Sequence, residues 1–109
     1  MEQKISITWT NPALDYLQAI FDFYAPHSTG LADRIVSRIV DRVDLLKQGF
    51  LEIGQIEPLL VKQPGKPRYL LEGHHKLIYR ITDPTHVLIL TIFDVRQDPN
   101  RLTGRFEDS

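Results

Sequence analysis

The stretch that decides the fold is RYLLEGHHKLIYRITDPTHVLILTIFD, residues Arg68–Asp94. It contains three runs that are rich in β-branched, aromatic and other apolar residues, each of a length typical of a strand. The dipeptide Gly73-His74 separates the first run from the second, and the tetrapeptide TDPT, residues 82–85, separates the second from the third. Both connections have the composition of tight turns. The stretch therefore predicts a three-stranded antiparallel meander, with strands over 68–72, 76–81 and 86–94.

The residues before this meander predict one more strand and a helix. Residues 5–9 alternate between apolar and polar, which is the period of a half-buried strand. The motif TNPA follows, in which Asn11 is the expected N-cap and Pro12 suits the first helical position, where no amide donor is needed. Apolar residues then recur at helical spacing as far as Tyr24, so we expect the first helix to end there, before Ala25-Pro26.

A second helix is predicted by the next stretch of helical periodicity. Ser28 or Thr29 is expected to cap its start, and Gly49 is placed to end it. Only about five residues separate the two helices, which favours an antiparallel helical hairpin. Residues 51–67 contain three prolines and two glycines and predict a long surface connection.

Length and composition bound the class of protein. A chain of 109 residues is enough for one compact domain and too short for two. We expect a single α+β domain over residues 1–109, with a core at about 4–100 and a C-terminal tail at 100–109. The sequence has no apolar run of membrane-spanning length, no signal-peptide core and no cysteine, which is typical of a cytoplasmic protein. The net charge of −1 gives no general basicity for coating nucleic acid.

Positive charge is nevertheless concentrated in one part of the chain. Residues 62–80 carry five basic groups and one acidic group, a sum of +4. Strand periodicity turns Lys76 and Arg80 away from the apolar face of the middle strand, and Arg68 lies on the neighbouring strand. If the helices cover the apolar face, these cations stand on an open face, where they can dock phosphate or an acidic peptide. The alternative is that Glu72, Asp94 or Asp98 of the chain neutralises them.

The dipeptide His74-His75 suggests a metal site, but its geometry argues against one. Adjacent residues on a strand point to opposite faces, so the two rings are not expected to converge on one ion. His27 and His86 are scattered along the chain and have no carboxylate at ligand spacing. We also find no glycine-rich phosphate loop and no nucleophile elbow. We therefore expect neither a metal nor a cofactor.

The segment YLLEGHHKLIYRITDPTHVLILTIFDVRQDP, residues 69–99, resembles the RelE/ParE toxin family of bacterial type II toxin–antitoxin systems. The features that carry the resemblance are the aromatic-plus-arginine strand LIYRI (77–81) and a last hydrophobic strand that runs into VRQDP (95–99). The segment WTNPALDYLQAIFDFYA (9–25) resembles the family's first helix, so the resemblance spans roughly residues 4–100. It implies a strand, a helical hairpin and a meander in that order, in a protein that inhibits bacterial growth.

The resemblance leaves two activities open. RelE-like members cut messenger RNA on the ribosome with basic and acid–base side chains on the sheet face, whereas ParE-like members poison DNA gyrase without a recognised catalytic set. In the RelE-like case Lys76, Arg80 and Arg96 are the catalytic candidates. His75 is a candidate acid or base, but strand parity turns it away from Lys76. The tail lacks the tyrosine that many RelE-like nucleases carry, and a pI of about 6.4 is low for work on ribosomes. We therefore favour the ParE-like branch.

In both branches the resemblance implies a cognate antitoxin as partner, with an acidic segment that meets the basic residues. The residues expected to bind the antitoxin or the target are Arg68, Lys76, Arg80 and Arg96. The target is DNA gyrase or the ribosome, and we expect neither membrane association nor sequence-specific DNA binding by the toxin alone. A third alternative is a degenerate member that keeps its partner and has lost toxicity. Arg96 is either a functional arginine at the rim of the sheet or the ion-pair partner of Asp94 or Asp98.

Overall fold

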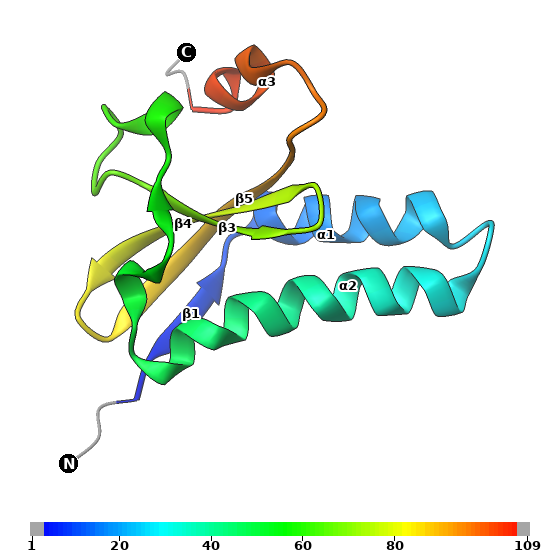
Figure 1. Cartoon of the computed structure of the whole chain (residues 1–109), viewed down its shortest axis with the longest axis horizontal. Helices are drawn as coiled ribbons and strands as arrows, with labels where there is room; N and C mark the ends of the chain where they lie inside the picture. Colours follow the sequence, from blue (N-terminus) through cyan, green and yellow to red (C-terminus); the bar gives the residue numbers. More distant parts are fainter. Residues whose placement is uncertain (1–3, 107–109) are drawn as a thin grey trace.

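The computed structural model describes residues 4–106 as a five-stranded sheet with helices on both faces (Figure 1). The strands are β1 (Ser6–Trp9), β2 (Gln55–Ile56), β3 (Arg68–Glu72), β4 (His75–Asp83) and β5 (His86–Asp94). The α-helices are α1 (Asn11–Tyr24), α2 (Thr29–Asp44) and α3 (Pro99–Gly104). Three short 3₁₀ helices, η1 (Leu45–Gln48), η2 (Leu51–Ile53) and η3 (Pro58–Leu60), lie between α2 and β3.

The strand order across the sheet is β1-β5-β4-β3-β2. The predicted meander is confirmed, because β3 pairs antiparallel with β4 and β4 pairs antiparallel with β5. The N-terminal strand β1 lies parallel to β5, in the register Ser6↔His86 to Trp9↔Ile89. The sequence did not predict this pairing, which places the first and last strands side by side. The α1–α2 hairpin lies along one face of the sheet, and its tip projects beyond the strands (Figure 1).

The first helix is capped by Thr10, not by Asn11 as the sequence predicted. The Thr10 hydroxyl oxygen accepts a hydrogen bond from the Ala13 amide at 3.2 Å and lies 2.8 Å from the Ile89 carbonyl, to which it donates. The cap therefore also ties the start of α1 to β5, a contact that no local pattern encodes. The cap of α2 is Ser28, one of the two predicted residues, and Gly49 ends the helical segment at a positive φ of 96°.

The main core lies between the helical hairpin and the sheet. The apolar stripes of α1 and α2 face alternate residues of β4 and β5, as their periodicities predicted. The buried residues of this core are Ala13, Ile39, Val43, Leu46, Leu51, Leu77, Tyr79, Val87, Ile89 and Ile92. The Tyr79 hydroxyl donates to the Leu51 carbonyl at 2.6 Å and accepts from the Gly54 amide at 3.0 Å. The end of this core is therefore closed by the connection that follows α2.

The predicted surface connection at 51–67 is more ordered and more buried than expected. It contains η2, β2 and η3, and β2 extends the sheet by pairing with β3. Glu57 is fully buried and Leu60 is 2% exposed. A Cβ atom at Gly54 would lie 2.6 Å from the Tyr69 carbonyl oxygen, so only glycine allows this approach to the sheet. The prediction failed because the segment is held by contacts with the sheet, which periodicity within the segment does not reveal.

The second face of the sheet is covered, so the predicted open face is wrong. Residues 99–104 form α3, which occupies the first half of the tail that we predicted at 100–109, and Asp98 caps this helix by accepting from the Asn100 amide. A second core lies beneath α3 and η3, formed by the buried residues Leu60, Ile78, Phe93 and Leu102. The last part of the predicted tail, 107–109, lies outside the described residues. Within the part of the chain that the structure describes, no helix has the length and apolar character needed to cross a membrane.

Candidate functional site

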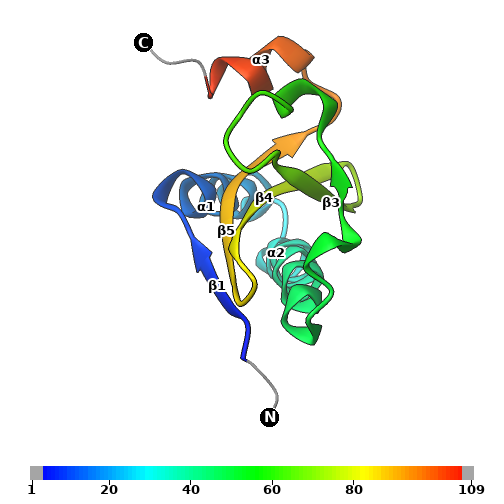
Figure 2. The same cartoon turned by 90° about the vertical axis from the view of Figure 1, so that its left-hand side faces the viewer.

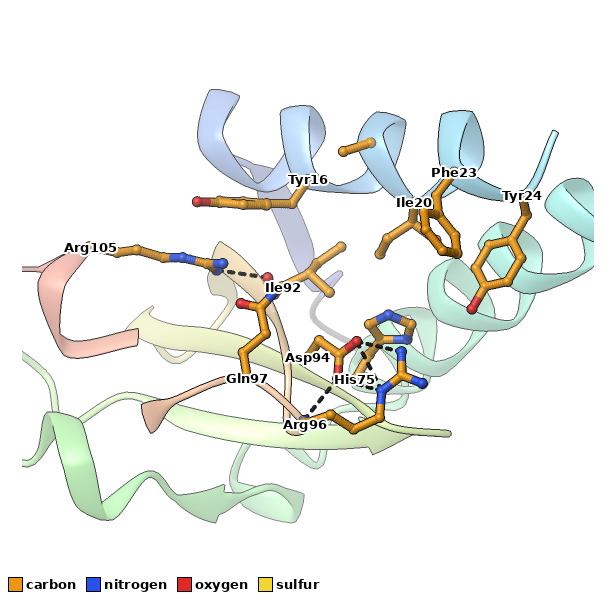
Figure 3. Close-up of a pocket in the computed structure, with 11 residues that line it drawn as sticks. Tyr16, Ile20, Phe23, Tyr24, His75, Ile92, Asp94, Arg96, Gln97 and Arg105 are labelled. Carbon is orange, nitrogen blue, oxygen red and sulfur yellow. Dashed lines mark hydrogen bonds and ion pairs between the residues drawn. The ribbon is translucent and has the colours of Figure 1, made fainter. Parts of the chain in front are cut away.

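A groove of about 340 Å³ runs between α1 and the C-terminal end of β5 (Figure 3). Its lining comes from α1, from β4 and β5, from the loop after β5 and from the residue that ends α3. The lining residues are Tyr16, Ala19, Ile20, Phe23, Tyr24, His75, Ile92, Asp94, Arg96, Gln97 and Arg105. The groove thus combines an apolar wall with charged groups, which is the usual composition of a binding site.

The apolar wall of the groove is one face of α1. Tyr16, Ile20, Phe23 and Tyr24 recur at three- and four-residue spacing, so a single helix face presents all four side chains. Phe23 is 68% exposed, although it packs edge-on against Tyr24 with ring centroids 5.0 Å apart. The apolar face of α1 is therefore wider than the sheet beneath it can cover, and part of it remains accessible.

Arg96 forms a two-point ion pair with Asp94 at one end of the groove. The Arg96 Nε atom lies 3.0 Å from Asp94 Oδ1, and its Nη2 atom lies 2.7 Å from Oδ2. The Arg96 amide also donates to Oδ1 at 2.8 Å. Hydrogen bonds from Arg96 hold the pKa of Asp94 far below its usual range, despite partial burial of the carboxyl group. Of the two predicted ion-pair partners of Arg96, Asp94 is therefore the one that binds it, whereas Asp98 caps α3.

His74 and His75 lie together beside this ion pair. Their ring centroids are 4.3 Å apart, and His74 Nε2 lies 3.7 Å from Asp94 Oδ2. Our geometric argument against convergence was wrong, because His74 belongs to the turn before β4 and is not bound by strand alternation. Burial lowers the pKa of His75, and neighbouring His74 lowers it further. His75 is 7% exposed and faces α1, whereas Lys76 faces the other side of the sheet, as parity predicted.

Arg105 stands at the other end of the groove and was not singled out in the sequence. Its guanidinium carbon lies 3.8 Å from the centre of the Tyr16 ring. Its Nη1 atom donates to the Ile92 carbonyl at 2.8 Å and to the Thr91 hydroxyl at 2.9 Å. Burial lowers its pKa, but the reference value of arginine is so high that the group stays charged at neutral pH. In the sequence, Arg105 is one arginine before an aromatic residue in a short predicted tail, and no pattern there indicates that it lies in a groove.

Lys76 is neutralised within the chain. Its ammonium group pairs with the fully buried carboxylate of Glu57 and lies 4.4 Å from the centre of the Tyr69 ring. The alternative in which the chain supplies the anion therefore holds for Lys76. The partner is Glu57 in the connection, a residue that the sequence gave no reason to select. Lys76 serves chiefly to hold that connection against β3 and β4.

Arg80 and Arg68 do not line the groove, and each has its own surroundings. The Arg80 stem packs under the turn at Gly65, where a Cβ atom would lie 2.8 Å from Arg80 Cγ. Its Nε atom is buried and has no hydrogen-bond partner among the described residues. Arg68 pairs in register with Tyr79, on the face of the sheet that α1 and α2 cover. It donates to the Gly54 carbonyl at 2.8 Å. Of the predicted binding residues, Arg96 alone lines the groove.

A helical hairpin laid against a meander, with an arginine after the last strand, is the arrangement that the resemblance to the RelE/ParE family implied. A family model described as "ParE toxin of type II toxin-antitoxin system, parDE" matches residues 7–99. The chain therefore belongs to the ParE toxin family and is a toxin component of such a module. Both the predicted family and the favoured branch are confirmed.

A solved structure agrees with this assignment. The chain is similar to one from the structure described as "Chromosomal ParDE TA system from P. aeruginosa", with 30% sequence identity and a TM-score of 0.69. The likeness covers 86% of this chain and 99% of the other. A search of curated proteins found no match.

Proposed function

We propose that this toxin acts in the bacterial cytoplasm by poisoning DNA gyrase and is neutralised by an antitoxin that occupies the groove beside α1. Membership of the ParE family over residues 7–99 is the observation that carries the proposal. The fold and the groove support it without supplying a catalytic set. The chain acts on gyrase as a binding protein, and it need not read DNA sequence itself.

The geometry of the sheet supports gyrase over the ribosome as the target. The face on which a RelE-like nuclease would hold RNA phosphate is covered by η3 and α3. Figure 2 shows α3 on the side of the strands away from α2. Lys76 on that face is paired with Glu57, so its charge is already compensated. An RNA phosphate would have to displace a buried carboxylate to reach this lysine, and that exchange is unfavourable.

The groove supports an antitoxin segment of defined character. Its wall is apolar, with exposed Phe23 as the most accessible group, and an arginine stands at each end, Arg96 and Arg105. Asp94 already compensates the charge of Arg96, so a segment with apolar residues and a carboxylate near Arg105 matches this pattern best. The exposed part of the Arg96 side chain can add a further contact to the segment. The predicted role of Arg96 in partner binding is retained in the proposal, and Arg105 is added to it.

Induced expression in a bacterial host without antitoxin tests the proposed target. We expect growth arrest with gyrase-linked DNA breaks and intact ribosome-bound messages. Purified toxin should inhibit supercoiling by purified gyrase in the same assay series. Arrest with cleaved messages and intact DNA would overturn the proposal, and unimpeded growth with no effect on purified gyrase would indicate lost toxicity.

Two arginine substitutions test the proposed antitoxin groove. Arg105→Ala should weaken binding of the co-expressed antitoxin, because the cation at one end of the groove is lost. The matched control is Arg101→Ala, which removes an exposed arginine from α3, outside the groove lining. Equal loss of binding in the two variants would place the antitoxin elsewhere on the surface.

A further inference from the structure

Three metal-ligating side chains converge at the end of β5. His74 contributes from the β3–β4 turn, His75 from the start of β4 and Asp94 from the end of β5. One ligand atom from each lies within 4.8 Å of the other two. The three residues come from segments that the hydrogen-bonded sheet holds side by side, since His75 is the register partner of Asp94. The cluster is thus built on the scaffold and not on a mobile tail.

A cation already occupies the space between two of these ligands. The Arg96 Nη2 atom lies 2.9 Å from His74 Nε2 and 2.7 Å from Asp94 Oδ2. A guanidinium nitrogen only donates hydrogen bonds, so the His74 Nε2 lone pair points toward the arginine. A histidine lone pair and a carboxylate therefore point toward one position, and the group that they hold there is positively charged. This is the arrangement of donors that also binds a metal ion.

We propose that His74, His75 and Asp94 form a binding site for a divalent transition metal, with Zn²⁺ as the ion that this donor set fits best. Two imidazole nitrogens and one carboxylate oxygen are a common set of three protein ligands for zinc, with a fourth position left for water or a partner group. Mg²⁺ and Ca²⁺ prefer sites made of oxygen ligands and fit the cluster less well. Tetrahedral coordination requires ligand atoms about 3.3 Å apart. His74 lies in the turn with its side chain one-third exposed, so reaching this spacing would require a movement of His74 toward the two strand residues.

The metal and Arg96 compete for the same carboxylate. Zinc at this position would take Asp94 from the guanidinium and leave Arg96 facing the groove that it already lines. The freed arginine would then be available to a carboxylate of a bound segment. Metal uptake would therefore couple to the charge at this end of the groove. The site itself does not depend on the identity of the toxin's target.

Calorimetric titration of the untagged full chain with ZnCl₂ tests the proposal. We expect binding of one zinc ion per chain. His74→Ala should weaken it by about tenfold or more, since a ligand is lost. Arg96→Gln should tighten it by about tenfold or more, because the competing positive charge is gone. The chain has no cysteine, so thiolates cannot contribute to the signal.

His27→Ala is the matched control, because His27 is an exposed histidine outside the cluster. It should leave zinc affinity unchanged, and circular dichroism should show every variant folded. The proposal is overturned if neither the wild type nor Arg96→Gln binds one zinc ion per chain. It is equally overturned if His27→Ala and His74→Ala lose the same affinity. These readouts involve neither growth nor gyrase, so they are independent of the proposed function.

Discussion

Lys76 is the partner of a buried carboxylate, and this changes what its substitution tests. Glu57 is fully buried, with one carboxylate oxygen paired to Lys76 and the other accepting from the Leu59 amide. Removing the lysine leaves this charge in the interior without its counter-ion, which is costly. Destabilisation would therefore explain a loss of toxicity in Lys76→Ala without any role of Lys76 in catalysis.

We predict that Lys76→Ala lowers the free energy of unfolding by about 3 kcal/mol, because Glu57 is left without its counter-ion. Urea denaturation followed by circular dichroism measures this change. Lys62→Ala is the control, since it removes an exposed lysine from the same connection. Equal midpoints for Lys76→Ala and Lys62→Ala would show that the pair contributes little.

The double variant Glu57→Gln/Lys76→Met should recover most of the stability lost in Lys76→Ala. Both charges are then absent, and the glutamine oxygen can still accept from the Leu59 amide. Denaturation under the same conditions gives the comparison. A double variant as unstable as Lys76→Ala would mean that packing of the lysine stem, and not the charge, dominates.

At the scale of elements, Tyr79 joins β4 to the connection between α2 and β3. Its hydroxyl bonds the Leu51 carbonyl and the Gly54 amide, and the ring belongs to the main core. We predict that Tyr79→Phe costs about 1–3 kcal/mol, because two backbone groups lose a buried partner while the ring is kept. Thermal unfolding of Tyr79→Phe beside Tyr69→Phe, whose hydroxyl bond to Gln55 is exposed, measures the difference. A smaller loss of stability in Tyr79→Phe than in Tyr69→Phe would contradict the role given to the Tyr79 hydroxyl.

The same hydroxyl predicts a dependence of stability on alkaline pH. Burial raises the pKa of Tyr79 above its ordinary value, and the hydrogen bond from Gly54 offsets this in part. A group with a raised pKa in the folded state stabilises the fold fully below its unfolded pKa, about 10. This contribution is lost as the pH rises through the folded pKa. The stability difference between wild type and Tyr79→Phe should therefore shrink above about pH 10, as urea denaturation at several pH values would show. A stability difference between the two proteins that stays constant above about pH 10 would contradict this prediction.

The whole molecule depends on two cores, one on each face of the sheet. The second core is small, and Leu102 from α3 is fully buried in it against Leu60, Ile78 and Phe93. Because α3 has six residues, it does not fold alone, and its stability comes from this contact. The position of Arg105 just after α3 then depends on the same packing.

We predict that Leu102→Ala destabilises the protein by about 2–4 kcal/mol through the cavity that it leaves. It should also weaken antitoxin binding, because Arg105 loses its support at the groove. Leu14→Ala is the matched control, since Leu14 is 46% exposed on α1. Denaturant unfolding and antitoxin affinity provide the two readouts. Loss of affinity without loss of stability would contradict the structural role of α3.

Much of the fold could be predicted from the sequence, because local periodicity reports which residues share a face. The alternation of Leu77, Tyr79 and Ile81 and the helical stripe that includes Ile39 and Val43 placed the main core between hairpin and meander, where it lies. The turn residue Gly73 adopts the positive φ of 59° that a tight turn between strands uses. The features that carried the family resemblance lay in these regular elements or directly after β5, so the family could be recognised as well.

The site was predicted less well, because its groups meet through packing between distant segments. Glu57 and Lys76 are 19 residues apart, and Arg105 reaches Tyr16 only because α3 folds back over β5. His74 meets Asp94 because a turn freed it from strand alternation. Periodicity describes each segment on its own, whereas these contacts depend on which segments pack against one another in the folded protein. The first strand, the hairpin, the meander and the family therefore follow from the sequence, while β2, the covered sheet face, the groove and the histidine cluster follow from tertiary packing.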